Sequence, residues 1–143
     1  MIQNILKQKG GDVITVLPSE TLKSAAAKMT EHHVAALFVL NGHGVDGLIS
    51  ERELIQAIAA HGERALVMPV SQVMQRNPPS TAPTDSLRHA MRLMTDHRVR
   101  HLAVVSGPEV IGVVSIGDVV KSRLEDLEAE ANVLRDVYIA AAR

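Results

Sequence analysis

The chain has 143 residues, of which 46% are hydrophobic and 22% are charged, and its formal net charge is -1. This balance is ordinary for a soluble globular protein and excludes a disordered tail, a fibrous repeat and a strongly basic surface for nucleic acid. The absence of cysteine excludes disulfides and zinc sites built on sulfur. The longest apolar run, Val34–Leu40, is far shorter than the roughly 20 residues of a membrane-spanning helix, so we expect no membrane segment and a cytoplasmic protein.

An internal repeat at a shift of 65 residues organises the sequence. Of the 36 positions in Pro18–Glu53, 13 are identical in Pro83–Asp118, and most of the others are conservative exchanges. Upstream, Ile2–Leu6 resembles Val70–Met74 at a slightly larger shift. The repeat predicts two packed units related by a pseudo-twofold axis, because a unit of about 60 residues buries too little surface to be secure alone.

Each copy predicts the element order β-α-β-β-α, and hence a mixed α/β (α+β) fold. β-Branched runs separated by turn residues predict the strands, which are Val13–Val16, Val34–Leu40 and Val45–Ile49 in the first copy and Ser80–Ala82, Val99–Val105 and Val110–Val114 in the second. Apolar residues at i, i+3, i+4 and i+7 predict helices that begin at Leu22 and Leu87. A further helix is expected after Ser50 and after Ser115.

The repeat also sets the expected domain boundaries. We expect a first repeat at 1–61, a linker at 62–69, a second repeat at 70–122 and a C-terminal helical extension at 123–143. The extension departs from the repeat, because its apolar residues follow alternating spacings of four and three, at Val120, Leu124, Leu127, Ala131, Leu134, Tyr138 and Ala141. Such a heptad stripe packs either along its own domain or against a partner chain, and its length favours a homodimer.

The segment Gly112–Asp118 has the form G-h-h-S-x-x-D and is echoed at Gly47–Glu53. Together with P-x-x-x-L at the start of each copy and an H-L-x-V-V strand at His101, it makes the chain resemble a tandem pair of CBS domains, the Bateman module. The chain is similar to small stand-alone bacterial CBS-pair proteins. This resemblance implies clefts between the two copies that bind an adenine nucleotide such as AMP, ADP, ATP or NAD.

The resemblance implies a better nucleotide site in the second copy. There Asp118 would hold the ribose hydroxyls and Ser115 would lie near the phosphates, at a helix N-terminus that favours anions. The basic start of the strand would clamp the phosphates, and aliphatic side chains would hold the purine. The residues expected at this site are Asp118, Ser115, Arg100, His101, Val99, Ile116, Ser80 and Thr81.

The first copy predicts a weaker site, because Glu53 stands where the family has aspartate. The residues expected there are Glu53, Ser50, Arg52, Ile14, Thr15 and Val16. Two structural alternatives stay open. The S-x-x-D/E spacing is also that of a helix capping box, which Ser50 and Glu53 fit well. The basic strand start near Arg100 equally fits a strand that simply begins in solvent.

These observations favour a regulatory module that changes conformation or assembly on binding an adenine nucleotide and signals to a regulated protein. The alternative is a ligand-free interaction module that acts through its dimer surface and C-terminal helix. An enzyme is least favoured, since the sequence shows no nucleophile–base pair, no metal-ligand spacing and no motif for a catalytic cofactor.

Overall fold

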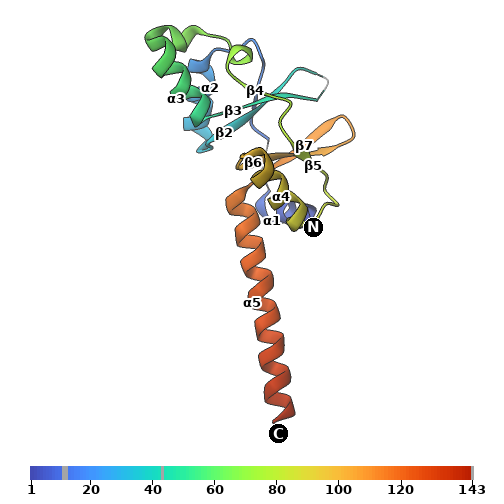
Figure 1. The fold of residues 1–143 in the computed structure, drawn as a ribbon. Coiled ribbons are helices and arrows are strands. Elements are labelled where there is room, and N and C mark those ends of the chain that lie inside the picture. The colour runs from blue at the N-terminus through green and yellow to red at the C-terminus, as the bar shows by residue number, and fades with distance from the viewer. Residues whose placement is uncertain (11–12, 43, 143) are drawn as a thin grey trace.

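A computed structural model describes residues 1–10, 13–42 and 44–142 as two lobes and a long C-terminal helix (Figure 1). The helices are α1 (Ile2–Lys9), α2 (Leu22–His32), α3 (Glu51–His61), α4 (Leu87–His97) and α5 (Ile116–Ala141). The strands are β1 (Thr15–Val16), β2 (Ala36–Leu40), β3 (Val45–Ser50), β4 (Gln75–Arg76), β5 (Ser80–Thr81), β6 (His101–Ser106) and β7 (Glu109–Ser115). The predicted α+β class, repeated elements and long last helix are confirmed.

The strands after α2 and α4 begin later than the sequence predicts. The residues that cap the C-termini of α2 and α4 are His33 and Arg98, and both adopt left-handed backbone with φ 54°. The chain turns sharply at such a residue and needs further residues before it can enter the sheet. β2 therefore begins at Ala36 instead of Val34, and β6 begins at His101.

Each lobe contains a small mixed sheet. In the first lobe the strand order is β1-β2-β3-β4, and in the second it is β5-β6-β7. The first strand of each sheet runs parallel to the second, and the second and third strands form an antiparallel hairpin. β4 belongs to the second repeat in sequence, yet it pairs antiparallel with β3 of the first repeat at Gly47 and Leu48.

The N-terminal segment of each repeat packs in the lobe of the other repeat. Ile2 and Ile5 of α1 are buried in the core of the second lobe, with Met94 and Val114. Conversely, Val70 is buried in the core of the first lobe. The 62–69 segment is mostly a 3₁₀ helix, Gly62–Val67, whose Ala65 is buried in the same core. The spatial lobes therefore cross the boundaries expected from the repeat.

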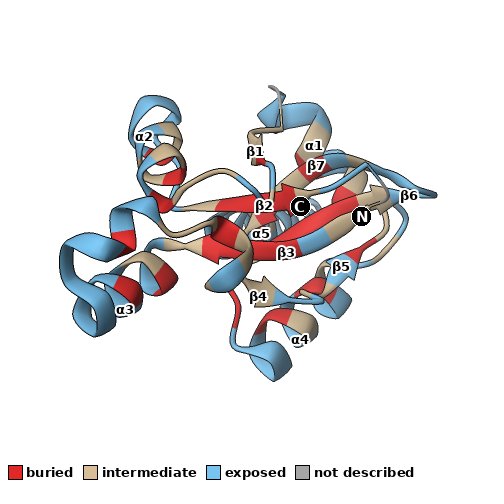
Figure 2. Ribbon diagram, turned by 90° about the horizontal axis from the view of Figure 1, so that it is seen from above, coloured by how far each residue is buried: buried red, intermediate tan, exposed pale blue. Residues whose placement is uncertain are grey.

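The central strands are buried on both faces, as Figure 2 shows for β2 and β3. Along β2, Leu37 and Val39 face the helices of the first lobe, where they join its core. Phe38 points to the opposite face, because side chains alternate along a strand, and it joins Leu48 in the core of the second lobe. The two lobes are therefore held together by a continuous apolar contact.

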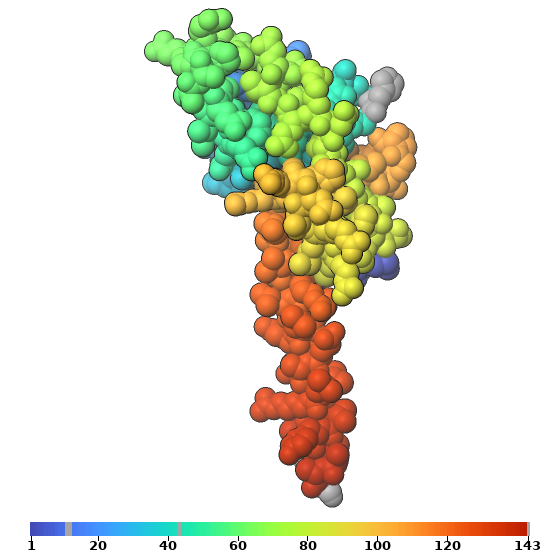
Figure 3. Space-filling view, in the orientation of Figure 1, coloured from blue at the N-terminus to red at the C-terminus, as the bar shows by residue number. Residues whose placement is uncertain are grey.

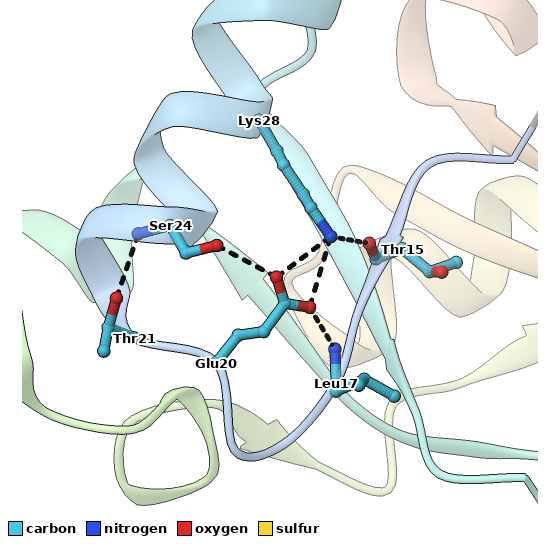
Figure 4. Close-up of polar contacts among 6 residues, drawn as sticks. All are labelled: Thr15, Leu17, Glu20, Thr21, Ser24 and Lys28. Carbon is cyan, nitrogen blue, oxygen red and sulfur yellow. Dashed lines mark hydrogen bonds and ion pairs between the residues drawn. The ribbon is translucent and has the colours of Figure 1, made fainter.

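A carboxylate fixes the loop that leads into α2 (Figure 4). Glu20 accepts hydrogen bonds from the Leu17 backbone N–H at 2.6 Å and from the Ser24 hydroxyl at 2.9 Å. Its carboxylate also pairs with Lys28 Nζ at 3.0 Å. Lys28 in turn donates to the Thr15 carbonyl at 3.0 Å, so the start of β1 and the helix are tied together.

Asp85 has the equivalent position before α4. Its carboxylate accepts from the Ala82 backbone N–H at 2.8 Å and from the Thr81 hydroxyl at 2.9 Å. These two hydrogen bonds hold the pKa of Asp85 below its usual value. The conservative exchange of Glu20 for Asp85 between the repeats thus preserves one structural function.

The glycine that opens each G-h-h-S motif lies against the N-terminal segment of the other repeat. A Cβ added at Gly47 would lie 2.5 Å from Met74 Sδ and 2.8 Å from the Gln75 carbonyl oxygen. At Gly112 it would lie 2.5 Å from Leu6 Cδ2 in α1. Both glycines therefore allow close packing of a segment that comes from the other repeat.

We expect Gly47→Ala to destabilise the protein by about 1–3 kcal/mol, because the new methyl group meets a backbone oxygen that cannot move alone. Gly112→Ala should cost less, since the end of a leucine side chain can turn away. Urea unfolding measures both. The matched control is Gly117→Ala, where the nearest atom is Ser115 Oγ at 3.6 Å. Equal unfolding free energies for the Gly47 and Gly117 variants would contradict this account of the packing.

Candidate functional site

Two clefts lie between the lobes, and we name the first the arginine cleft. It has a volume of about 320 Å³ and brings Ser50 and Arg52 of the first repeat to the basic segment Arg98–His101 of the second. Leu48 and Ile55 supply aliphatic walls. The cleft therefore joins the G-h-h-S motif of one repeat to the strand start of the other.

Local backbone geometry brings the basic residues into the arginine cleft. Ser50 ends β3 and is the N-cap of α3, so the positive end of the α3 dipole lies at the cleft with Arg52 in the first turn. Arg98 is the left-handed residue at the end of α4, a conformation that costs a non-glycine residue roughly 1–2 kcal/mol. The sharp turn it makes sets both Arg98 and Arg100 along the same wall.

The positive charge of the arginine cleft is not neutralised by protein ion pairs. Within residues 1–10, 13–42 and 44–142, the ion pairs link Lys9 to Asp118, Lys28 to Glu20 and His89 to Asp85. None of the cleft arginines takes part in them. Glu51 lies in the same cleft as a single carboxylate beside three guanidinium groups. An anion would find unpaired hydrogen-bond donors here.

The second cleft, which we name the lysine cleft, has a volume of about 380 Å³. Ser115 of the second repeat and His33 of the first repeat both line it, and Lys9 contributes an ammonium group. Its apolar wall includes Ile14 and Ile111. The lysine cleft is the counterpart of the arginine cleft under the repeat, but it lacks the three arginines.

Asp118 lies at the edge of α1 and α5 instead of in either cleft. Its carboxylate accepts from the Ser115 backbone N–H at 2.9 Å and pairs with Lys9 Nζ at 2.8 Å. The Ser115 hydroxyl accepts from the Asp118 backbone N–H at 3.1 Å, which completes a capping box. Burial raises the pKa of Asp118, but the hydrogen bonds from Lys9 and Ser115 outweigh it and hold that pKa below its usual value.

Glu53 is also used as a helix-capping group. Its side chain is buried, and its carboxylate accepts from the backbone N–H of Ser50 at 2.8 Å and from the Ser50 hydroxyl at 2.6 Å. The capping alternative is therefore satisfied in both repeats. The acidic residue of each motif points back to its own helix N-terminus in this structure.

The structure does not bring the residues expected at each nucleotide site together in one cleft. Val99, Arg100 and His101 meet Ser50 and Arg52 in the arginine cleft, whereas Ser115 meets Ile14 in the lysine cleft. The reason is that the lobes face each other, so each cleft takes its motif and its strand start from different repeats. The remaining expected residues, which line neither cleft, are Asp118, Glu53, Ile116, Ser80, Thr81, Thr15 and Val16.

Most of these remaining residues have other roles. Thr81 is buried and bonded to Asp85, and Val16 is part of the first-lobe core. Thr15 offers its carbonyl to Lys28, and Ser80 pairs with Ala103 in the sheet.

Lys9 is a site residue that motif analysis missed. It comes from α1, a segment whose sequence neighbours all belong to the first repeat, while its contacts are in the second lobe. Only the weak match of Ile2–Leu6 to Val70–Met74 hinted that this helix has a counterpart in the other repeat. His33 could have been found from Arg98, its equivalent at a shift of 65.

His101 lines both clefts. Burial lowers its pKa, and the positive charges of Lys9 and Arg100 lower it further. Asp118 and Glu51 act in the opposite direction but do not overcome these effects. The imidazole is therefore held neutral at a point where two anion-attracting clefts meet.

We expect Lys9→Met to raise the pKa of both Asp118 and His101. Without the Lys9 ammonium group the Asp118 carboxylate loses a stabilising charge, so the pKa of Asp118 rises. The protonated form of His101 loses a repelling charge, so the pKa of His101 rises as well. NMR titration of the carboxyl carbon and the imidazole protons measures them. Lys7→Met, on the same helix, is the matched control and should leave both pKa values unchanged. If the Lys9 variant also left them unchanged, the ion pair would be absent in solution.

The CBS domain family model matches residues 8–60 and 70–125. The Arabidopsis thaliana protein named CBS domain-containing protein CBSX3, mitochondrial, is 31% identical over 147 residues, which cover 96% of this chain and 71% of that protein. The crystal structure of the CBS-domain containing protein ATU1752 from Agrobacterium tumefaciens superimposes with a TM-score of 0.80 at 34% identity, covering 85% of this chain and 98% of that one.

The CBS domain protein PAE2072 from Pyrobaculum aerophilum, solved in complex with AMP, has the same fold, with a TM-score of 0.73 at 23% identity over 82% of this chain and 88% of that one. These similarities agree with the two-lobed structure and with the repeated motifs. The chain belongs to the CBS domain family and contains a tandem pair of the domain.

Proposed function

We propose that this protein is a regulatory module that binds an adenine nucleotide in the arginine cleft, with the phosphates on Arg52, Arg98 and Arg100. The observation that carries the proposal is the convergence of these guanidinium groups, without ion-pair partners among the described residues, at the N-terminus of α3. Planar guanidinium groups bind phosphate oxygens in pairs, and a helix N-terminus adds a favourable dipole.

The rest of the cleft suits a purine held by aliphatic contacts. Leu48, Ile55 and Val99 line it, and its volume is within the range of small-molecule pockets, about 300–1,000 Å³. The only aromatic side chains of the chain are Phe38, which is buried in the core, and Tyr138, far along α5. We therefore infer that the base packs against aliphatic groups instead of stacking on a ring.

The lysine cleft is the candidate for a second, weaker site. Ser115 and Ile14 line it, but Lys9 and two histidines stand there in place of the arginines. A ribose contact from Asp118 would require its carboxylate to exchange Lys9 for the sugar hydroxyls. Ribose binding by Asp118, and by the buried Glu53, therefore stays a proposal that needs rearrangement of a helix cap.

We infer that nucleotide binding changes how the lobes, or two copies of the chain, pack, and that a partner protein responds. The AMP complex of PAE2072, which shares the fold, supports the ligand class. We assign no catalytic step, and we keep the predicted cytoplasmic location and homodimer as part of the proposal. The competing proposal is a ligand-free interaction module, for which the exposed apolar residues of α5 are the favouring observation.

Arg100→Ala should weaken AMP binding at least tenfold while weakening adenosine binding less than about twofold. A hydrogen bond to a charged group contributes about 1.5–3 kcal/mol, and each 1.4 kcal/mol is tenfold in affinity. Isothermal titration calorimetry measures both ligands. Arg92→Ala, which removes the same charge from the exposed face of α4, is the control.

Equal losses for AMP and adenosine would mean that Arg100 does not bind phosphate. If the wild-type protein bound none of AMP, ADP, ATP and NAD, the interaction-module proposal would replace this one.

Binding of AMP should be coupled to proton uptake by His101 in mildly acidic buffer. In the free protein its pKa lies below the usual value of about 6.5, and a phosphate anion nearby favours the imidazolium, so binding raises that pKa and tightens as the pH falls. Calorimetry in buffers of different ionisation enthalpy detects the proton. The AMP phosphate also titrates in this range, so the informative quantity is the difference between proteins. His101→Asn should take up fewer protons on binding AMP than the wild type does, whereas His33→Asn, at the lysine cleft, should take up the same number as the wild type. Equal proton uptake by the wild type and the His101 variant would refute the coupling.

A further inference from the structure

The C-terminal part of α5 leaves the lobes and contacts no other element among the residues that the structure describes, as the projecting column in Figures 1 and 3 shows. Every residue from 123 to 142 is exposed, including Leu134 at 70% and Tyr138 at 75%. Helices owe most of their stability in proteins to packing of an apolar face, and a bare helix of this kind is marginal in water. This segment therefore needs a partner surface.

The apolar residues of this segment form a coiled-coil seam. In heptad notation Leu124, Ala131 and Tyr138 are a positions, and the d positions are Val120, Leu127, Leu134 and Ala141. The seam is already open near the lobes, where Ile116, Val120 and Leu124 line a shallow hollow on α5. A second helix could therefore lie along α5 from the lobes to the C-terminus.

The charges beside the seam select the partner and its direction. Arg123 and Glu130 are g positions, and Glu128 and Arg135 are the e positions five residues after them. In a parallel, in-register pair each g residue faces the e residue of the next heptad on the other helix. Arg123 then faces Glu128 of the second copy, and Glu130 faces Arg135 of the second copy. All these contacts join opposite charges.

The same residues cannot form these ion pairs within a single helix. Residues five apart do not face each other on one helix, where the interacting spacings are three and four. In an antiparallel pair, e faces e and g faces g. Two antiparallel registers pair six of the seven seam residues. The register centred at Ala129 would set Glu128 against Glu128 and Glu130 against Glu130 of the second copy, and like charges would disfavour it. The register shifted by half a heptad would set Glu128 against Arg135 but would leave Arg123 and Glu130 without a charged partner, so the parallel pair forms more ion pairs than either.

We propose that α5 forms a parallel, in-register, two-stranded coiled coil with a second copy of this chain, fixed in register by ion pairs from Arg123 to Glu128 and from Glu130 to Arg135 between the copies. This arrangement sets both pairs of lobes at the same end of the coil. It specifies which surface forms the expected homodimer and how the two helices are oriented. It does not require a bound nucleotide, so its tests are independent of the arginine cleft.

Sedimentation velocity of the full chain tests the seam. The wild type should sediment as a dimer, and the double variant Leu127→Asp/Leu134→Asp as a monomer. Ile139→Asp changes an exposed apolar residue at a b position, outside the seam, and should remain a dimer. Since these residues contact neither lobe, the variants should keep the wild-type thermal unfolding of the lobes. A wild-type monomer, or a dimer that survives the double change, would overturn the proposal.

The direction can be tested with single cysteines, because the chain has none of its own. Val120→Cys and Ala141→Cys should each cross-link to the same position of the second copy under mild oxidation. Asp136→Cys, at an outward f position, is the control and should not. An antiparallel dimer would leave both seam variants uncross-linked, and that result would overturn the parallel arrangement.

The ion pairs can be tested by charge reversal. Glu128→Arg should raise the dimer dissociation constant at least tenfold, because two symmetric attractions become repulsions. Adding Arg123→Glu to that variant should restore the constant to within about threefold of wild type. Failure of the second change to rescue the first would show that these residues do not face each other.

Discussion

The close contact between each repeat's N-terminal segment and the other lobe is the constraint on which the structure depends. The contact is closest at Gly47 and Gly112, which have no side chain, so that the Met74–Gln75 segment and Leu6 lie against the motif backbone. This exchange ties the lobes together through both chain segments as well as through their apolar faces. It also fixes which surfaces face each other, and therefore the composition of the clefts.

The packing of the lobes determines which cleft receives the basic strand start. Each cleft takes its helix N-terminus from one repeat and its strand start from the other, so the basic segment Arg98–His101 faces Ser50 instead of Ser115. Sequence divergence between the two strand starts therefore produces a difference in charge between the two clefts. His101 lines both clefts, so protonation of its imidazole would add positive charge to both at once.

The repeat, its elements and the long last helix could be predicted because they rest on local signals, namely hydrophobic periodicity, turn residues and self-similarity. The Ser115 cap was likewise predictable from its own spacing. The membership of each cleft was not, because it depends on how the lobes are paired in space. Lys9 shows this most clearly: no local pattern indicates that it would reach Asp118 in the other repeat.

α5 connects the lysine cleft to the C-terminal seam. It is one helix from Ile116 to Ala141, with its N-cap Ser115 lining the cleft and Lys9 holding Asp118 in its first turn. A ligand that drew Lys9 or Asp118 away would change the packing of the helix start, and a continuous helix carries such a change along its length. Coupling between two binding events is reciprocal, so association of two copies through α5 would alter the nucleotide affinity by the same factor that the nucleotide alters association.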